Sequence, residues 1–139
     1  MISSDVLEHV FFPIRNSLLG CYKILRPKGY LVMTMPWNFR RPSIEHYPWM
    51  VRYKVVENEP GNFTVVGKTK DGIEIKIDQP YFHGGPGNTL ELRKLSLDAI
   101  IDEIQSVGFT NVEVCLESVR KFGIRRSDGV VGVITARKE

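Results

Sequence analysis

One stretch of the chain decides its fold class: Tyr22-Lys-Ile-Leu-Arg-Pro-Lys-Gly-Tyr-Leu-Val-Met-Thr-Met-Pro36. It opens with the end of a predicted helix, which runs from about Pro13 to Leu25 and carries apolar residues at helical spacing on one face. Pro27-Lys28-Gly29 then stops that helix. The nearly continuous apolar run over 30–35 is typical of a parallel strand that is covered on both faces. A helix, a tight turn and a buried strand in this order indicate the second half of a βαβ unit and an α/β fold.

The flanking segments extend this pattern in both directions. Apolar residues near 1–4 look like the end of a strand that runs into a short helix. Toward the C-terminus, Ser96 has the properties of a helix N-cap, and the apolar spacing after it predicts an amphipathic helix over 96–107. Two further strands are predicted near 111–116 and 130–136.

The middle of the chain shows little periodicity, with one hairpin as the exception. Residues 36–62 hold four prolines and five aromatic residues, and long loops of this kind are more often functional than short polar ones. An alternating pattern joined at Lys70-Asp71-Gly72 predicts a β-hairpin inserted at about 63–77. A second irregular loop over 79–89 contains His83-Gly-Gly-Pro-Gly87.

Length and composition limit the classes of protein to which the chain can belong. Its 139 residues suffice for one domain, and 42% hydrophobic with 25% charged residues exclude a wholly disordered or collagen-like chain. The formal charge of +3 falls short of the basic footprint of a dedicated nucleic-acid binder. Arg120-Lys121 and Arg125-Arg126 form a small basic cluster that fits a solvated loop, with an anionic substrate or RNA contact as the lesser alternative.

The same data give an expected location. No apolar run approaches the about 18 residues that a membrane-spanning helix needs. No basic region followed by an apolar run marks a secretory signal. Cys21 and Cys115 lie far apart and match no metal or redox spacing. We therefore expect a cytoplasmic protein with reduced thiols and without a membrane partner.

Two motifs of the chain resemble a known family. Ile2-Ser-Ser-Asp-Val-Leu-Glu-His-Val10 and Lys23-Ile-Leu-Arg-Pro-Lys-Gly29 occur in the order and at the spacing of the class I S-adenosylmethionine-dependent methyltransferases. The chain is most similar to the large group whose middle section reads Val-Leu-Glu-His and then Arg-Val-Leu-Lys-Pro-Gly-Gly before a strand. The helix from Ser96 to Gly108, followed by two strands, also matches the C-terminal order of that group. The resemblance covers nearly the whole chain and is looser over 37–95.

The resemblance implies the C-terminal half of a Rossmann-like methyltransferase fold, with residues 1–139 forming a single partial domain. We expect a mixed sheet of two parallel strands and a final antiparallel strand pair, with both helices packed on it and the 63–77 hairpin as an insertion. The family's glycine-rich cofactor turn and its ribose-holding acid have no counterpart in this sequence. The segment from His83 to Gly87 is no substitute, because it does not join a strand to a helix and Pro86 lacks a backbone donor.

This resemblance implies a transferase that uses S-adenosylmethionine as cofactor and a small molecule as methyl acceptor. Because the cofactor turn is missing, we expect these residues alone to be inactive and to bind the cofactor weakly or not at all. The alternative is a non-catalytic truncated remnant that acts as an oligomeric binding module. In the family the first strand pairs with one from the missing half, so we expect a homo-oligomer formed through the unpaired sheet edge or the bared face.

The cofactor-binding candidates are Ser4, Asp5 and Val6. They lie at the C-terminal end of the first predicted strand, at the edge where open α/β sheets bind ligands. The resemblance implies that this spot lies beside the methionine end of the cofactor. The alternative is that Asp5 caps the helical turn over 6–10 by accepting hydrogen bonds from its exposed N–H groups.

The substrate-binding candidates are Trp37, His46 and Tyr47, in the long loop after the second predicted strand, whereas Trp49 is expected to fold inward. His46 and His83 are also the candidate catalytic residues, because a histidine titrates near neutral pH and can accept a proton. For His83 the alternative is a turn histidine with no chemical role.

No metal site is predicted. His46 and His83 lack a cysteine or a carboxylate at ligand spacing along the sequence, and the cysteines are isolated. Glu8 and His9 belong to the first resemblance motif and are equally well explained as packing or structural hydrogen-bonding residues.

Overall fold

The computed structural model describes residues 1–38, 42–122 and 132–139. Within them the chain forms two α-helices, two short 3-10 helices and a set of strands, most of which are short. The helices are α1 (Ile14–Ile24), α2 (Leu97–Ser106), η1 (Leu7–His9) and η2 (Arg120–Phe122). The strands are β1 (Ile2–Ser4), β2 (Tyr30–Thr34), β3 (Trp37–Asn38), β4 (Ile44–Glu45), β5 (Met50–Glu59), β6 (Asn62–Thr69), β7 (Glu74–Ile77), β8 (Phe82–His83), β9 (Thr89–Leu90), β10 (Arg93–Ser96), β11 (Thr110–Cys115) and β12 (Val133–Arg137).

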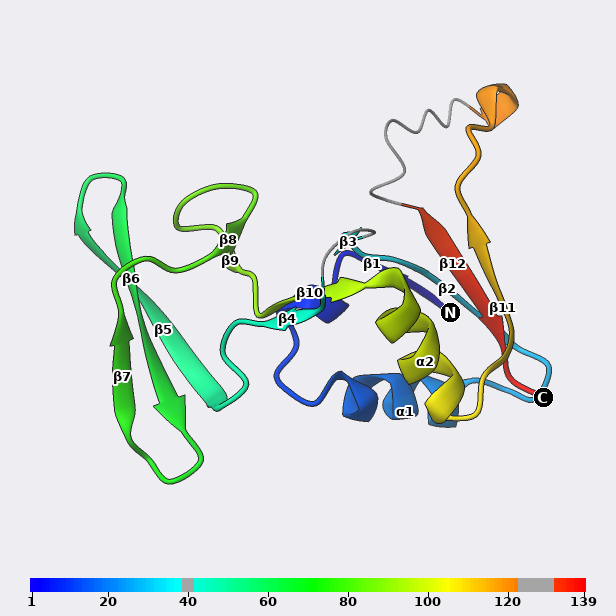
Figure 1. Ribbon diagram of the computed structural model, residues 1–139, viewed down its shortest axis with the longest axis horizontal. Coiled ribbons are helices and arrows are strands. Elements are labelled where there is room, and N and C mark those ends of the chain that lie inside the picture. The colour runs from blue at the N-terminus through cyan, green and yellow to red at the C-terminus, as the bar shows by residue number, and fades with distance from the viewer. Residues whose placement is uncertain (39–41, 123–131) are drawn as a thin grey trace.

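The main sheet has four strands in the order β1-β2-β12-β11 (Figure 1). β1 runs parallel to β2, and β12 is antiparallel to both of its neighbours, β2 and β11. The predicted parallel pair and the final antiparallel pair are therefore confirmed. The last strand of the chain lies inside the sheet, between β2 and β11.

Helices α1 and α2 pack against each other and against one face of the main sheet. Leu31 and Met33 point to that face, and their partners on β12 in the sheet, Ala136 and Ile134, point the same way. These side chains and the inner faces of both helices form the main core: Leu7, Ile14, Leu18, Leu31, Met33, Met35, Trp37, Leu95, Ile100, Ile104, Val107, Phe109, Ile134 and Ala136. Both predicted helices are confirmed, with ends one or two residues shorter than expected.

The opposite face of the main sheet is partly open. Val32 and Thr34 on β2 are only partly buried, and Ile2, which pairs with Val32, is 80% exposed. The expectation that the apolar run of β2 is covered on both faces is therefore wrong for the described residues. The helices contribute to one face only, so successive β2 side chains alternate between the core and the surface.

The middle of the chain contains more strand than its sequence pattern indicates. The predicted hairpin over 63–77 is confirmed as β6 and β7, but β5 adds a third, ten-residue strand that the sequence analysis treated as loop. β5 was missed because most of its residues are exposed, so it lacks the alternation of a half-buried strand. Residues 93–96 form β10, which pairs in parallel with β3 and antiparallel with β4.

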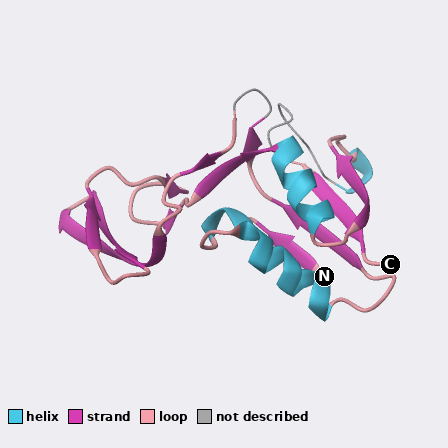
Figure 2. Cartoon of the chain, turned by 60° about the horizontal axis from the view of Figure 1, so that its bottom comes forward, coloured by secondary structure: helices cyan, strands magenta, loops and turns pink. Residues whose placement is uncertain are grey.

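The β5-β6-β7 sheet lies at one end of the molecule, away from the main sheet and its helices (Figure 2). It packs around a second core made of Tyr47, Met50, Val65, Leu90 and Leu92. Gly67 on β6 is needed there, because a Cβ atom at this position would lie 2.5 Å from the side chain of Met50 and 2.8 Å from that of Trp49. The region between the two cores is made of η1, β4, β8, β9 and β10. It holds the site described next.

Among the described residues, no helix is long and apolar enough to cross a membrane.

Candidate functional site

The most unusual side chain of the molecule is the buried carboxylate of Glu8 in η1. The side chain is 0% exposed, and neither of its carboxylate oxygens has a hydrogen-bond partner among the described residues. Burial raises the pKa of the Glu8 carboxyl above its ordinary value, and the attraction of His9 and His83 offsets only part of this rise. A buried carboxylate without such partners is costly, so its surroundings require an explanation.

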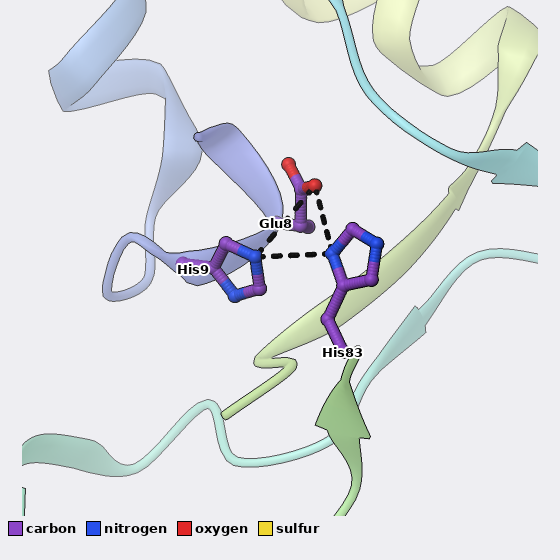
Figure 3. Close-up of side chains that lie close together, drawn as sticks. All are labelled: Glu8, His9 and His83. Carbon is purple, nitrogen blue, oxygen red and sulfur yellow. Dashed lines mark hydrogen bonds and ion pairs between the residues drawn. The ribbon is translucent and has the colours of Figure 1, made fainter. Parts of the chain in front are cut away.

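Two histidines lie against this carboxylate (Figure 3). Glu8 Oε1 is 3.7 Å from His9 Nε2 and 3.4 Å from His83 Nδ1. The two ring nitrogens are 3.2 Å apart, and the rings stack at a centroid distance of 5.3 Å. The histidines are 74 residues apart in sequence, because His83 comes from β8 and His9 from η1.

The backbone fixes the orientation of the His9 ring. His9 Nδ1 lies 2.8 Å from the carbonyl oxygen of Leu90. A carbonyl only accepts, so Nδ1 carries the proton and a neutral His9 presents the lone pair of Nε2 to His83 and Glu8. His9 is 17% exposed at its side chain whereas His83 is 40% exposed, so the cluster opens to solvent on the His83 side.

Arg93 on β10 holds the η1 turn in place. Its buried guanidinium donates through Nη1 to the carbonyl oxygens of Leu7 and Val10, and through Nε to Glu45 Oε1 at 2.8 Å. The amide of Leu92 donates to the carbonyl oxygen of Glu8 at 2.8 Å. Hydrogen bonds from Leu92 and Arg93 thus hold the turn that carries Glu8 and His9.

Ser4 ends β1, and Asp5 and Val6 follow it at the carboxyl ends of the parallel strands, as the sequence predicts; all three are exposed. The hydroxyls of Ser4 and Thr34 are 2.8 Å apart, and the Asp5 amide donates to the Thr34 carbonyl oxygen at 3.0 Å. Asp5 has a left-handed backbone with φ of 50°, which aspartate tolerates better than most residues. The alternative role of Asp5 as a cap is contradicted, because η1 has no side-chain cap hydrogen bond.

The three predicted substrate residues do not form one open wall. Trp37 on β3 is 1% exposed and belongs to the main core. His46 Nε2 lies 3.2 Å from Glu91 Oε1, and its ring stacks on Tyr81 at 4.2 Å. The Tyr47 hydroxyl accepts a hydrogen bond from the Tyr81 amide, and burial raises the pKa of Tyr47. His46 and Tyr47 therefore share a neighbourhood with Tyr81, while Trp37 lies elsewhere.

The fold brings a carboxylate to each of the two candidate catalytic histidines, Glu8 to His83 and Glu91 to His46. Sequence spacing could not show either pair, and the reasoning against a metal site relied on that spacing alone. Glu8 and His9, which the sequence indicated as packing or structural hydrogen-bonding residues, were not predicted to share a site with His83. The hydrogen bond of His9 to the Leu90 carbonyl oxygen agrees with the second of these roles. The adjacency of Glu8 and His9 within the Leu7-Glu8-His9 motif was the available signal.

Two hollows of the surface are lined by none of the three residues of the Glu8 cluster. One, of about 430 Å³, is lined by residues of both helices and of β4, among them Ile14, Glu45 and Asp102. Another, of about 300 Å³, lies on the β5-β6-β7 sheet beside Arg52 and Lys68. Neither is lined by a residue proposed from the sequence for cofactor, substrate or catalysis.

Comparisons with known proteins give only distant structural likenesses. No family model matches the chain, and no curated protein matches it. Among solved structures, the chain is similar to an S-adenosylmethionine-dependent methyltransferase from Mesorhizobium loti, with a TM-score of 0.45 and 14% sequence identity. The match covers 99% of this chain and 60% of that protein, so this chain spans less than two thirds of its length. A likeness this distant carries no argument about function.

Proposed function

We propose that this chain is the C-terminal part of an S-adenosylmethionine-dependent methyltransferase that acts on a small molecule. The observation that carries the proposal is that the strands beside the two resemblance motifs are neighbours in one sheet. The Asp5-Val6-Leu7-Glu8-His9 motif follows β1, and the Leu25-Arg26-Pro27-Lys28-Gly29 motif leads into β2, the parallel neighbour of β1. The carboxyl ends of both strands meet at the Ser4–Thr34 contact, and ligands of open α/β sheets bind at such an edge.

The side-chain oxygens at this edge of the sheet suit the cofactor. S-adenosylmethionine, when bound, supplies a methyl group on a positively charged sulfur and also carries an ammonium group. The exposed Asp5 carboxylate and the Ser4 hydroxyl offer oxygens that can accept hydrogen bonds from such an ammonium group. Their role is to bind and orient, because methyl transfer depends mainly on the positioning of donor and acceptor.

The acceptor's proton must leave when the new bond to its oxygen or nitrogen forms, and a positioned base assists this step. Of the two candidate histidines, His83 is 40% exposed at its side chain and His46 is 9% exposed. His83 is therefore the more accessible to a small molecule.

We propose weak cofactor binding by these 139 residues, without turnover. Gly84, Gly85 and Gly87 have left-handed backbone angles, but they form the turn between the antiparallel strands β8 and β9. A glycine-rich cofactor turn instead joins a strand to a helix, where the backbone approaches the ligand closely. Ser4, Asp5 and Val6 then offer only part of a cofactor site, and we expect the affinity to be low.

The test is an amide chemical-shift titration of the nitrogen-labelled chain with S-adenosylmethionine. We expect shifts confined to Ser4, Asp5, Val6 and Thr34, and their loss in Asp5→Asn. The matched control is Asp78→Asn, which changes an exposed aspartate just after β7 and should leave the shifts intact. No shifts at millimolar cofactor, or shifts scattered over the surface, would overturn the proposal. Micromolar affinity in calorimetry would contradict the incomplete site.

A non-catalytic oligomeric binding module is the second candidate, and one observation favours it. β1 is an outer strand of the main sheet, and Ile2 on it is 80% exposed. An exposed strand edge is a template for pairing with another chain. Self-association together with no cofactor-dependent shift would favour this candidate over the methyltransferase.

A further inference from the structure

We propose that Glu8, His9 and His83 bind one divalent transition-metal ion. One atom from each residue lies within 4.8 Å of the other two, and the pairwise distances are 3.7, 3.4 and 3.2 Å. The inference concerns metal binding by this cluster and does not rest on the proposed methyl transfer.

The spacing of the three atoms suits a single ion. Metal–nitrogen and metal–oxygen bonds of about 2.0–2.2 Å at tetrahedral angles place neighbouring ligand atoms about 3.3–3.6 Å apart. The observed separations of 3.2 to 3.7 Å lie close to this range, so small side-chain adjustments bring all three atoms to bonding distance. The three side chains converge on one point from two segments that are far apart in sequence (Figure 3).

The buried carboxylate of Glu8 is the independent sign of a cationic ligand. It is 0% exposed, and neither oxygen has a hydrogen-bond partner among the described residues. A buried carboxylate is usually paired with a cation or bound to a metal. Arg93, a buried cation that also holds η1, donates from Nε to Glu45 and from Nη1 to backbone carbonyls. Its Nη2 has no hydrogen-bond partner among the described residues, and no Arg93 nitrogen bonds Glu8.

The supporting contacts are those expected around a metal ligand. A histidine that binds a metal through one ring nitrogen commonly donates from the other to a carbonyl or carboxylate, which fixes the ring. His9 makes this contact, from Nδ1 to the Leu90 carbonyl oxygen at 2.8 Å, and so directs Nε2 at Glu8 and His83. Arg93 and the Leu92 amide hold the η1 backbone from the other side.

The donor set indicates the class of metal. Two imidazole nitrogens and one carboxylate suit Zn²⁺, Fe²⁺, Co²⁺ or Mn²⁺, whereas Ca²⁺ and Mg²⁺ favour oxygen ligands. Three protein ligands leave coordination positions open, and the 40% exposed His83 side chain puts the open side toward solvent. A hydroxyl or carboxylate oxygen of a small molecule can fill these positions. With an ion bound, His83 acts as a ligand and not as the proton acceptor considered above.

The experiment titrates chelator-treated, tag-free protein with Co²⁺ and follows the visible absorption, with Zn²⁺ as competitor. We expect one ion per chain, with a spectrum of nitrogen and oxygen ligands that Zn²⁺ abolishes. His83→Gln should weaken the affinity by more than about 100-fold, because loss of even an outer partner of a metal ligand costs about 10- to 100-fold. Its partly exposed position makes a folding defect a small risk, and circular dichroism checks this.

The matched control is His46→Gln, which removes the other histidine that lies beside a carboxylate. It should bind Co²⁺ like the unmodified chain. Glu8→Gln, which keeps the side-chain shape, should weaken binding as His83→Gln does. The proposal is overturned if the unmodified chain binds no ion, if His83→Gln binds as well as it does, or if His46→Gln alone loses the ion. Because the readout is metal binding, failure of the methyltransferase proposal leaves this result intact.

Discussion

Arg93 connects the η1 turn to β4 through a buried guanidinium, and its removal tests how much that connection stabilises the fold. In Arg93→Met the carbonyl oxygens of Leu7 and Val10 lose their donor and Glu45 loses its partner. We expect the free energy of unfolding to fall by about 3 kcal/mol, measured by urea denaturation. Arg93→Lys should not restore it, because an ammonium group cannot reproduce the fork of donors.

The neighbouring Lys94→Met is the control for Arg93→Met. Its side chain is partly exposed, so we expect a change within about 0.5 kcal/mol. A loss below about 1 kcal/mol in Arg93→Met would show that the guanidinium contributes little to holding the turn.

The two thiols should differ in reactivity. Burial raises the pKa of the Cys21 thiol, whereas Cys115 is exposed. The thiolate is the reactive form, so a raised pKa lowers its fraction at a given pH. At mildly alkaline pH we expect iodoacetamide to modify Cys115 about ten times faster than Cys21, followed by mass spectrometry of the peptides. The modification rate of Cys21 should still be rising at pH values above the ordinary pKa of a thiol. Equal rates for the two cysteines would contradict the burial of Cys21.

At the residue scale, the sequence predicted what depends on near neighbours. Ser96 as a helix cap and the position of Ser4 and Asp5 at the carboxyl end of β1 follow from local pattern, and both are found. The Glu8–His83 contact joins residues from opposite sides of the β5-β6-β7 insertion. No local pattern shows such a contact, and so the sequence indicated only a packing or structural hydrogen-bonding role for Glu8.

At the scale of a single element, the start of helix α2 depends on its capping hydrogen bond. Ser96 Oγ accepts from the Ala99 amide at 3.2 Å, which satisfies one of the free N–H groups at the helix start. Ser96→Ala should therefore lower the free energy of unfolding by about 1 kcal/mol. Ser17→Ala, inside α1, is the control and should be neutral or slightly stabilising, because alanine favours a helix interior. Equal effects of both changes in thermal or urea denaturation would contradict a capping role.

Elements with a clear period were predicted well, and elements without one were not. α1 and α2 have one buried face each, and β2 is a compact apolar run, so their positions follow from the sequence. β5 exposes most of its side chains, and β3 and β4 have two residues each. Their pairing depends on partners elsewhere in the chain, a tertiary effect that outweighs local propensity.

At the scale of the whole molecule, we propose that two copies of the chain associate through β1 and the open face beside it. β1 pairs with β2 on one side only among the described strands, and Ile2 is 80% exposed. Light scattering coupled to size exclusion should show a concentration-dependent dimer. Ile2→Lys should weaken it at least about ten-fold, since burial of an isoleucine contributes about 1.5–3 kcal/mol.

Ile24→Lys provides the matched control, because Ile24 is 74% exposed but lies at the end of α1. It should leave the dimer intact. A monodisperse monomer at all working concentrations would contradict the proposal. Equal weakening of the dimer by Ile2→Lys and Ile24→Lys would place the contact elsewhere.

The layout of the main sheet could be predicted from the order of elements, because parallel pairing and the final antiparallel pair follow from the motifs and their resemblance. The separate second core could not, since its members Tyr47, Met50, Val65, Leu90 and Leu92 come from segments without a common period. The open face of β2 was also missed, because an apolar run gives no sign of which neighbours cover it.

The presence of two cores has a consequence for how the protein opens. The main core and the second core share no side chain, so we expect them to open locally at different free energies. Amides of β5–β7 should exchange with solvent faster than those of β2 and β12. Glu8 and His9 lie in η1, beside the main core, and His83 lies in β8, beside the second. A metal ion held by all three would add a link between the two cores to the hydrogen bonds that already join η1 to Leu90 and Leu92. When Zn²⁺ is added, hydrogen exchange of the amides around both cores should then slow in parallel. A variant without His83 should not show this slowing.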